Sequence, residues 1–184
     1  TTGPDEPIIA IDQEGGRVVR TAEIGVQLPS AAALAQKGCS HHIRQAAYYN
    51  AACLHTLGVN TNFAPVLDLA SPHANALPSR CWGYDTQSVI SHAGVWNRAT
   101  FGRGIQTCGK HFPGHGDTAT DSHYGLPIVN KDLATLQNCE LKPYEIAIEQ
   151  GVDMIMTAHI LYPQLEKDTV RSNKTGKNES LPAT

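Results

Sequence analysis

Residues 110–124, with the sequence KHFPGHGDTATDSHY, concentrate side chains that can hold or transfer protons. The segment contains three histidines, two aspartates and a lysine, and its proline and glycines predict a shaped loop rather than a helix or a strand. A single histidine in a loop is usually an ordinary surface residue. So many titratable groups after a predicted strand indicate a catalytic or binding site instead.

Two kinds of chemistry fit this loop. In the first, Asp121 orients His123 and supports its charged form, so that the imidazole can give and take a proton near neutral pH. In the second, His111, His115 and His123 bind a divalent metal ion together with an aspartate, as in a metal-dependent hydrolase. The first two of these histidines are separated by a Pro-Gly turn rather than a helical turn, which weakens the metal hypothesis without excluding it.

A second segment, residues 12–20 (DQEGGRVVR), places acidic side chains and two arginines around a Gly-Gly pair. Carboxylates accept hydrogen bonds from sugar hydroxyls, and a guanidinium donates in a fixed fork, so this composition suits a polyhydroxylated ligand. The plainer alternative is a turn held by salt bridges.

An alternation of predicted strands and helices positions both segments. Short apolar runs bounded by turn residues are typical of buried parallel strands, and they cover residues 7–12, 59–68, 107–111 and 152–159. Apolar residues at three- and four-residue intervals predict helices over 43–57, 85–105 and 133–149, the last of them bent or split at Pro143. This alternation predicts an α/β fold with a parallel sheet.

Two topologies compete for this pattern, an open doubly wound sheet and a (β/α)8 TIM barrel. The dinucleotide fingerprint and the phosphate-binding loop are both absent from the sequence. Polar residues instead follow the carboxyl ends of several strands, where the catalytic loops of a barrel converge; they are Asp12, Asp68, Lys110, His111 and His159. The sequence therefore favours a barrel. Because a complete barrel takes about 250 residues, either the sheet is open or residues 1–184 are part of a larger barrel. We expect these residues to form one domain without an internal boundary, with 163–184 as a polar tail.

The composition argues against other classes of protein. Lys and Arg number 14 against 17 Asp and Glu, so no basic excess exists to bind nucleic acid. No apolar run approaches the roughly 18 residues of a membrane helix, and the polar start does not predict a signal peptide. The five cysteines form no C-x-x-C pair and are expected to be free thiols, which slightly favours a cytoplasmic location.

Together the two polar segments resemble glycoside hydrolase family 3, in particular its bacterial β-N-acetylglucosaminidases of the peptidoglycan-recycling type. The resemblance rests on IDQEGGR at 11–17, KHFPGHG at 110–116 and DSH at 121–123. Shorter pieces fit in the same order, namely FAPVLD at 63–68, Arg80 and MTAH at 156–159. KHFPGHG with the downstream DSH is highly specific, and the match extends from residue 8 to about residue 162.

The resemblance implies a (β/α)8 TIM barrel, here incomplete at both ends, of which this chain is the central part. It also implies a retaining hydrolase that removes terminal, non-reducing β-linked N-acetylglucosamine from glycans or muropeptides. It implies an acid/base pair of His123 and Asp121, which differs from the two carboxylates usual in glycosidases. It assigns sugar binding to Asp12, Arg20, Asp68, Arg80, Lys110 and His111. It implies no metal or organic cofactor, and relatives of this type include both intracellular enzymes and exported lipoproteins.

One element of the family has no counterpart in this sequence. The nucleophile implied by the resemblance is an aspartate at the end of a later strand, and none of the 184 residues matches it. We therefore expect the chain by itself to bind sugar weakly and not to turn it over. A metal-dependent hydrolase and a non-catalytic carbohydrate-binding fragment stay open as alternatives.

Overall fold

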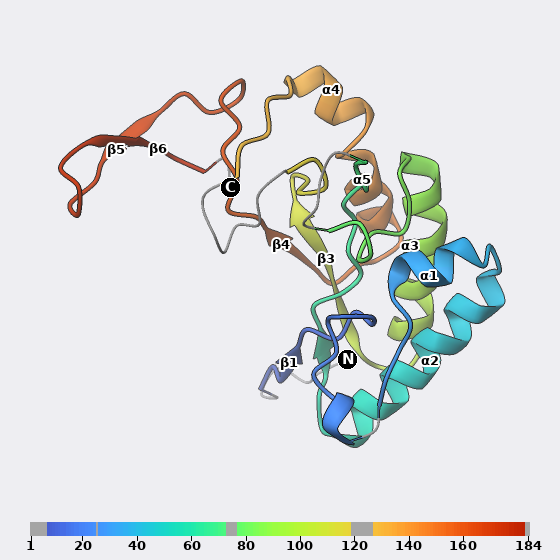
Figure 1. Ribbon diagram of the computed structural model, residues 1–184. Helices are drawn as coiled ribbons and strands as arrows, with labels where there is room; N and C mark the ends of the chain where they lie inside the picture. The colour runs from blue at the N-terminus through green and yellow to red at the C-terminus, as the bar shows by residue number, and fades with distance from the viewer. Residues whose placement is uncertain (1–6, 25, 73–76, 119–126, 183–184) are drawn as a thin grey trace.

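The computed structural model describes residues 7–24, 26–72, 77–118 and 127–182 (Figure 1). Its strands are β1 (Ala10–Ile11), β2 (Thr61–Asn62), β3 (Gln106–Phe112), β4 (Met154–Thr157), β5 (Thr169–Arg171) and β6 (Asn178–Ser180). Its helices are η1 (Ala22–Ile24), α1 (Ala31–Gln36), α2 (Ser40–Thr56), α3 (Thr86–Phe101), α4 (Leu133–Asn138) and α5 (Lys142–Glu149). The four predicted strands and the three predicted helical regions are confirmed with shifted ends, whereas η1 and α1 were not predicted.

The main sheet is parallel throughout, and its strands lie in the order β1-β2-β3-β4, the same order as in the sequence. Helices α1, α2, α3 and α5 all lie on one side of the strands (Figure 1). A doubly wound sheet instead reverses its strand order and carries helices on both faces. The described residues thus form an α/β fold with an open four-stranded sheet, and this part of the chain closes no barrel.

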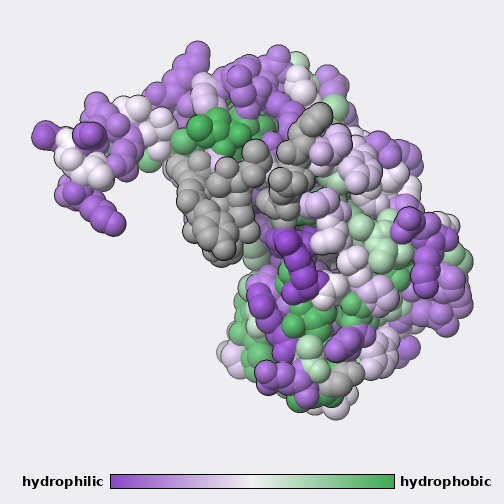
Figure 2. All heavy atoms as spheres, viewed as in Figure 1, coloured by the Kyte–Doolittle hydropathy of each residue, from purple (hydrophilic) through white to green (hydrophobic). Residues whose placement is uncertain are grey.

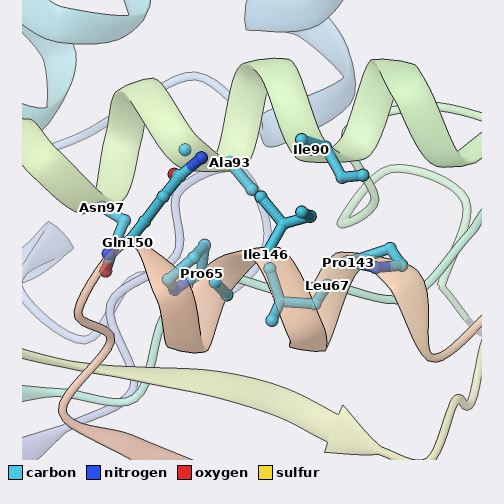
Figure 3. A pocket seen from close by; sticks show the side chains of 10 residues that line it. Pro65, Leu67, Ile90, Ala93, Asn97, Pro143, Ile146 and Gln150 are labelled. Carbon is cyan, nitrogen blue, oxygen red and sulfur yellow. The ribbon is translucent and has the colours of Figure 1, made fainter.

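The helical layer buries the main apolar core against the sheet. Trp82 and Trp96 pack in a tilted geometry with their ring centroids 5.7 Å apart, near the centre of this core. Beside them, α5 runs alongside α3, both helices contact β3, and Ile146 points toward α3 (Figure 3). The gap that the two helices leave measures only about 10 Å³, so the space between α3 and α5 is packed and too small for a ligand.

Local signals set the helix ends. Asp85 caps α3 by accepting a hydrogen bond from the backbone N of Ser88 at 2.8 Å. Gly58, in the left-handed region at φ 76°, follows the end of α2. Pro143 lies in the first turn of α5, and the predicted helix over 133–149 is indeed split into α4 and α5.

The polar tail contains an element that the sequence did not reveal. Strands β5 and β6 form an antiparallel hairpin that projects from the body of the molecule (Figure 1). All of their residues are exposed, and the surface of the hairpin is largely hydrophilic (Figure 2). A hairpin with no buried face needs no alternation of apolar residues, so its sequence predicted only a loop.

The core position of Trp96 gives a first prediction. Replacement of this fully buried side chain by alanine should lower the free energy of unfolding by about 3–5 kcal/mol, because a large cavity is left beside Trp82. Phe101 lies on the same helix but is 51% exposed, so Phe101→Ala should cost less than about 1 kcal/mol. Urea unfolding of both variants measures the difference, and equal losses would contradict this description of the core.

Candidate functional site

The carboxyl ends of three neighbouring strands bring charged residues from distant parts of the sequence together. Asp12 directly follows β1, Asp68 lies beyond β2, and Lys110 and His111 lie at the end of β3. The backbone N of Leu67 donates to the carbonyl of Lys110, which aligns the segment after β2 with β3. The convergence predicted for these residues is therefore confirmed.

Lys110 lies at the centre of this site. Its ammonium group is 2.6 Å from Asp12 Oδ1 and 2.6 Å from Glu14 Oε1, while its side chain is only 1% exposed. A buried ammonium is tolerated only where its charge is compensated, and the two carboxylates provide that compensation. Glu14 is buried as well, whereas the side chain of Asp12 is 40% exposed. The cluster of Lys110, Asp12 and Glu14 is thus open to solvent only on the Asp12 side.

Arg80 closes the other side of Glu14. Its Nε and Nη2 donate to the two carboxylate oxygens of Glu14 at 2.8 and 2.7 Å, a bidentate pair. Burial alone would raise the pKa of Glu14, but the hydrogen bonds from Arg80 and the charge of Lys110 outweigh it and lower that pKa. Glu14 therefore stays ionised and holds both cations in place.

His111 is fixed between an acid and a guanidinium. Its Nδ1 is 2.7 Å from Asp68 Oδ2, and its Nε2 is 3.3 Å from Arg80 Nη2. Because a guanidinium can only donate, Nε2 must accept, and the ring proton lies on Nδ1, from which it is donated to Asp68. The arrangement sets the tautomer of His111 as well as the orientation of its ring.

Asp68 binds several groups at and just after the end of β3. Besides the ring of His111, it accepts hydrogen bonds from the backbone N of His111 and of His115 and from the hydroxyl of Tyr144. Burial would raise its pKa, yet the contact with the ring of His111, together with the backbone N–H of His115, lowers it. The side chain has no exposed area. Asp68 therefore contacts the protein rather than solvent.

His115 is a second imidazole beside His111, with the two ring centroids 5.6 Å apart. Its Nδ1 is 2.6 Å from Thr118 Oγ1, and that hydroxyl donates to the carbonyl of His115, so the ring itself donates from Nδ1. Burial lowers the pKa of His115, which favours the neutral ring. The next residue, Gly116, has to be a glycine, because an added Cβ would lie 1.6 Å from the carbonyl oxygen of Leu69.

The loop after β1 is held by Gln13, whose side chain is fully buried. Its amide accepts from the backbone N of Arg20 at 2.7 Å and donates to Thr21, and its backbone pairs with Asn62 and Asn50. These bonds fix the backbone on which Asp12 and Glu14 stand.

The predicted residues divide into three groups. Asp12, Arg80, Lys110, His111 and Asp68 lie in one connected network. Arg20 is exposed, and its backbone N donates a hydrogen bond to the side chain of Gln13. Asp121 and His123 lie outside the described residues, so their predicted role as an acid/base pair stays a prediction.

Sequence reasoning missed three members of the network. Glu14 stood in the recognised DQEGG segment, and the presence of two basic partners elsewhere could have indicated its role. His115 was considered only as a metal ligand. Tyr144 is 76 residues from Asp68, and nothing in the local sequence indicates their contact.

Among the described residues, the surroundings of His111 do not favour a metal ion; His123, the third histidine of the metal hypothesis, lies outside them. The described ranges contain no group of three or more His, Cys, Asp or Glu side chains that could hold an ion. In addition, Nε2 of His111 is occupied by the cationic Arg80. A metal ion placed there would be repelled by the guanidinium.

What remains available to a ligand is a polar edge with an exposed carboxylate, a partly exposed guanidinium and an imidazole. A parallel sheet with such a site at its carboxyl edge defines an α/β protein of the enzyme type. The donors and acceptors are those that bind a polyhydroxylated ligand.

Comparison with known proteins narrows this class. Residues 5–181 match the model of the glycosyl hydrolase family 3 N-terminal domain. The chain therefore belongs to glycoside hydrolase family 3, as its motifs predicted.

Individual relatives agree with this assignment. A beta-hexosaminidase from Neisseria meningitidis is 34% identical over 168 residues, which cover 88% of this chain and 46% of that protein. A crystal structure of NagZ from Neisseria gonorrhoeae in complex with N-trifluoroacetyl-D-glucosamine superposes with a TM-score of 0.82 at 34% identity, over 88% of this chain and 50% of that one. A family 3 β-N-acetylglucosaminidase from Paenibacillus sp. superposes with a TM-score of 0.79 at 36% identity, over 88% and 31% of the two chains. The chain thus spans about half the length of the curated relatives it matches.

The network around Asp68 gives a second prediction. Asp68→Asn should lower the free energy of unfolding by about 3 kcal/mol at pH 7, because the amide group cannot accept from all four donors. The pKa of Asp68 is lowered in the folded state, so its stabilisation is complete above the unfolded pKa of about 4. This stabilisation is lost as the pH falls through the folded pKa. The difference in the free energy of unfolding between Asp68→Asn and the wild type should therefore become smaller at low pH.

Urea unfolding at pH 7 and pH 3.5 measures this narrowing. Asp168→Asn, at an exposed position beside the hairpin, is the control and should change stability by less than about 0.5 kcal/mol. A loss for Asp68→Asn that is no smaller at pH 3.5, below the unfolded pKa of about 4, would contradict the lowered pKa of Asp68 in the folded state.

Proposed function

We propose that this chain is part of a retaining glycoside hydrolase that removes terminal, non-reducing β-linked N-acetylglucosamine. The observation that carries the proposal is the buried Lys110–Glu14–Arg80 network, which presents Asp12 and His111 at the carboxyl edge of the sheet in a member of family 3. The names of the relatives, beta-hexosaminidase and β-N-acetylglucosaminidase, support the choice of sugar.

The proposed complete fold is a TIM barrel, of which residues 1–184 form a central part without an internal domain boundary. Sequential parallel strands with helices on one side support this topology. In such a barrel the carboxyl ends of further strands would lie beside Asp12 and Lys110.

The proposed binding roles follow from exposure. Asp12 accepts hydrogen bonds from sugar hydroxyls and the partly exposed Arg80 donates to them, with Arg20 at the rim. Lys110 and His111, whose polar atoms are bound within the network, complete the wall of the sugar site. Asp68 has no exposed area, and we propose that it acts on the sugar through the orientation of His111.

The proposed reaction has two steps. A carboxylate from a part of the barrel outside these residues attacks the anomeric carbon, the glycosidic C–O bond breaks, and the protonated imidazole of His123 gives its proton to the leaving oxygen. His123 then removes a proton from water, which attacks the anomeric carbon and releases the carboxylate. Asp121 orients the imidazole in both steps. Neither step needs a metal or an organic cofactor.

The proposal also covers the leaving group and the cellular compartment. The leaving group is a glycan or muropeptide, as in a peptidoglycan-recycling enzyme. All five cysteines are free thiols in the structure, which supports a reducing, cytoplasmic compartment. Among the described residues, no helix has both the length and the apolarity to cross a membrane.

A kinetic test uses the protein encoded by the complete gene. It should hydrolyse an aryl β-N-acetylglucosaminide in preference to the β-glucoside, and His123→Ala should reduce kcat by about 10²–10⁴-fold, the usual contribution of a general acid/base. A chelator should leave the rate unchanged. Loss of activity with chelator would favour the metal-dependent hydrolase, and sugar binding without turnover would favour the carbohydrate-binding alternative.

Arg80 offers a further prediction on the same enzyme. Arg80→Lys keeps the charge but loses the bidentate contact with Glu14 and the donor to His111, so kcat/KM should fall about 10–100-fold. Lys142→Arg, at an exposed ion pair on α5, should leave it unchanged. Steady-state kinetics decide, and an unaltered Arg80→Lys enzyme would remove Arg80 from the proposed site.

A further inference from the structure

An ion cluster lies beside the network described above and joins two points on either side of Asp121 and His123. Lys131 follows that stretch of sequence and Asp117 precedes it. The ammonium group of Lys131 is 3.1 Å from Asp117 Oδ2 and also binds Glu140 Oε1. One lysine thus connects the start and the end of the segment with the junction between α4 and α5.

Glu140, which binds this lysine, is itself held in place by burial and packing. It is 8% exposed, and its Cβ and Cγ pack under Gly114, where an added Cβ would lie 3.0–3.1 Å from them. The carbonyl of Gly114 also accepts a hydrogen bond from the buried hydroxyl of Tyr162. The start of the loop is therefore held by the same acidic residue that binds Lys131.

The end of the loop is held against the segment that follows β4. The backbone N of Val129 donates to the carbonyl of Leu161, and the backbone N of Leu161 donates to the carbonyl of Pro127, both at 2.9 Å. Lys131 lies two residues beyond this pairing. Its contact with Asp117 connects this fixed end to the start of the loop.

The electrostatics favour a permanently charged link. Burial would lower the pKa of Lys131, but the hydrogen bonds and charges of Glu140 and Asp117 raise it. Removal of the ammonium would leave two carboxylates near each other, with Glu140 Oε2 already buried and without a hydrogen-bond partner among the described residues. The two acids would then separate.

We propose that Lys131 is a positioning residue for the acid/base step, in which its ion pairs with Asp117 and Glu140 fix the spacing between the two ends of the loop that carries Asp121 and His123. The inference rests on the proposed function, since it concerns where that loop delivers its proton. Lys131 itself contacts no substrate in this proposal.

The test uses the protein encoded by the complete gene and two β-N-acetylglucosaminides. One carries a dinitrophenyl group, which leaves without a proton, and the other is a disaccharide, whose leaving oxygen needs one. Lys131→Met should lower kcat/KM for the disaccharide about tenfold or more and for the dinitrophenyl glycoside less than about threefold, because only the first depends on a placed acid. Lys131→Arg, which can bind both carboxylates, should restore most of the loss.

Lys142→Met is the matched control. Lys142 binds Glu145 at 2.6 Å on the exposed face of α5, so its loss should change neither substrate. Equal losses on both substrates for Lys131→Met, or an unchanged disaccharide rate, would overturn the proposal. A wild-type enzyme that cleaves neither glycoside would instead refute the proposed function, and this outcome is visible before any substitution is made.

Discussion

The ammonium group of Lys110 is almost completely withdrawn from water at the carboxyl end of β3, and the arrangement of the site follows from the need to compensate its charge. Glu14 and Asp12 supply that charge from the loop after β1. Because Glu14 is itself buried, it requires Arg80, which in turn sets the acceptor nitrogen of His111. Each group is thus held by the next, and only the outer side of Asp12 is left largely open.

A second anchor lies deeper. Asp68 collects donors from the backbone and ring of His111, from the backbone of His115 and from Tyr144, and so ties the segment after β3 to the segment after β2 and to α5. Hydrogen bonds to a buried carboxylate are stronger than those between neutral groups. The KHFPGHG loop therefore has a fixed shape where it leaves the sheet. Asp117, the next residue, binds Lys131, which also binds Glu140.

The strands and long helices were predictable because burial imposes apolar runs and helical periodicity on the sequence. The split at Pro143 and the cap at Asp85 were predictable from local backbone chemistry. The short α1 was missed because it spans only six residues, and the β5–β6 hairpin because it has no buried face. The closed barrel belongs to the proposal, since the described sheet is open.

The sequence by itself determined the family, the strand ends that carry polar residues and most members of the polar network, because these depend on residue type and local spacing. Only the tertiary structure decided which charges meet. The bidentate pair joins Arg80 to Glu14, 66 positions away. The contact that sets the tautomer of His111 comes from Arg80, 31 positions away, and Tyr144 contacts Asp68 across 76 positions. Such contacts are set by the packing of strands and helices, and local sequence carries no signal for them.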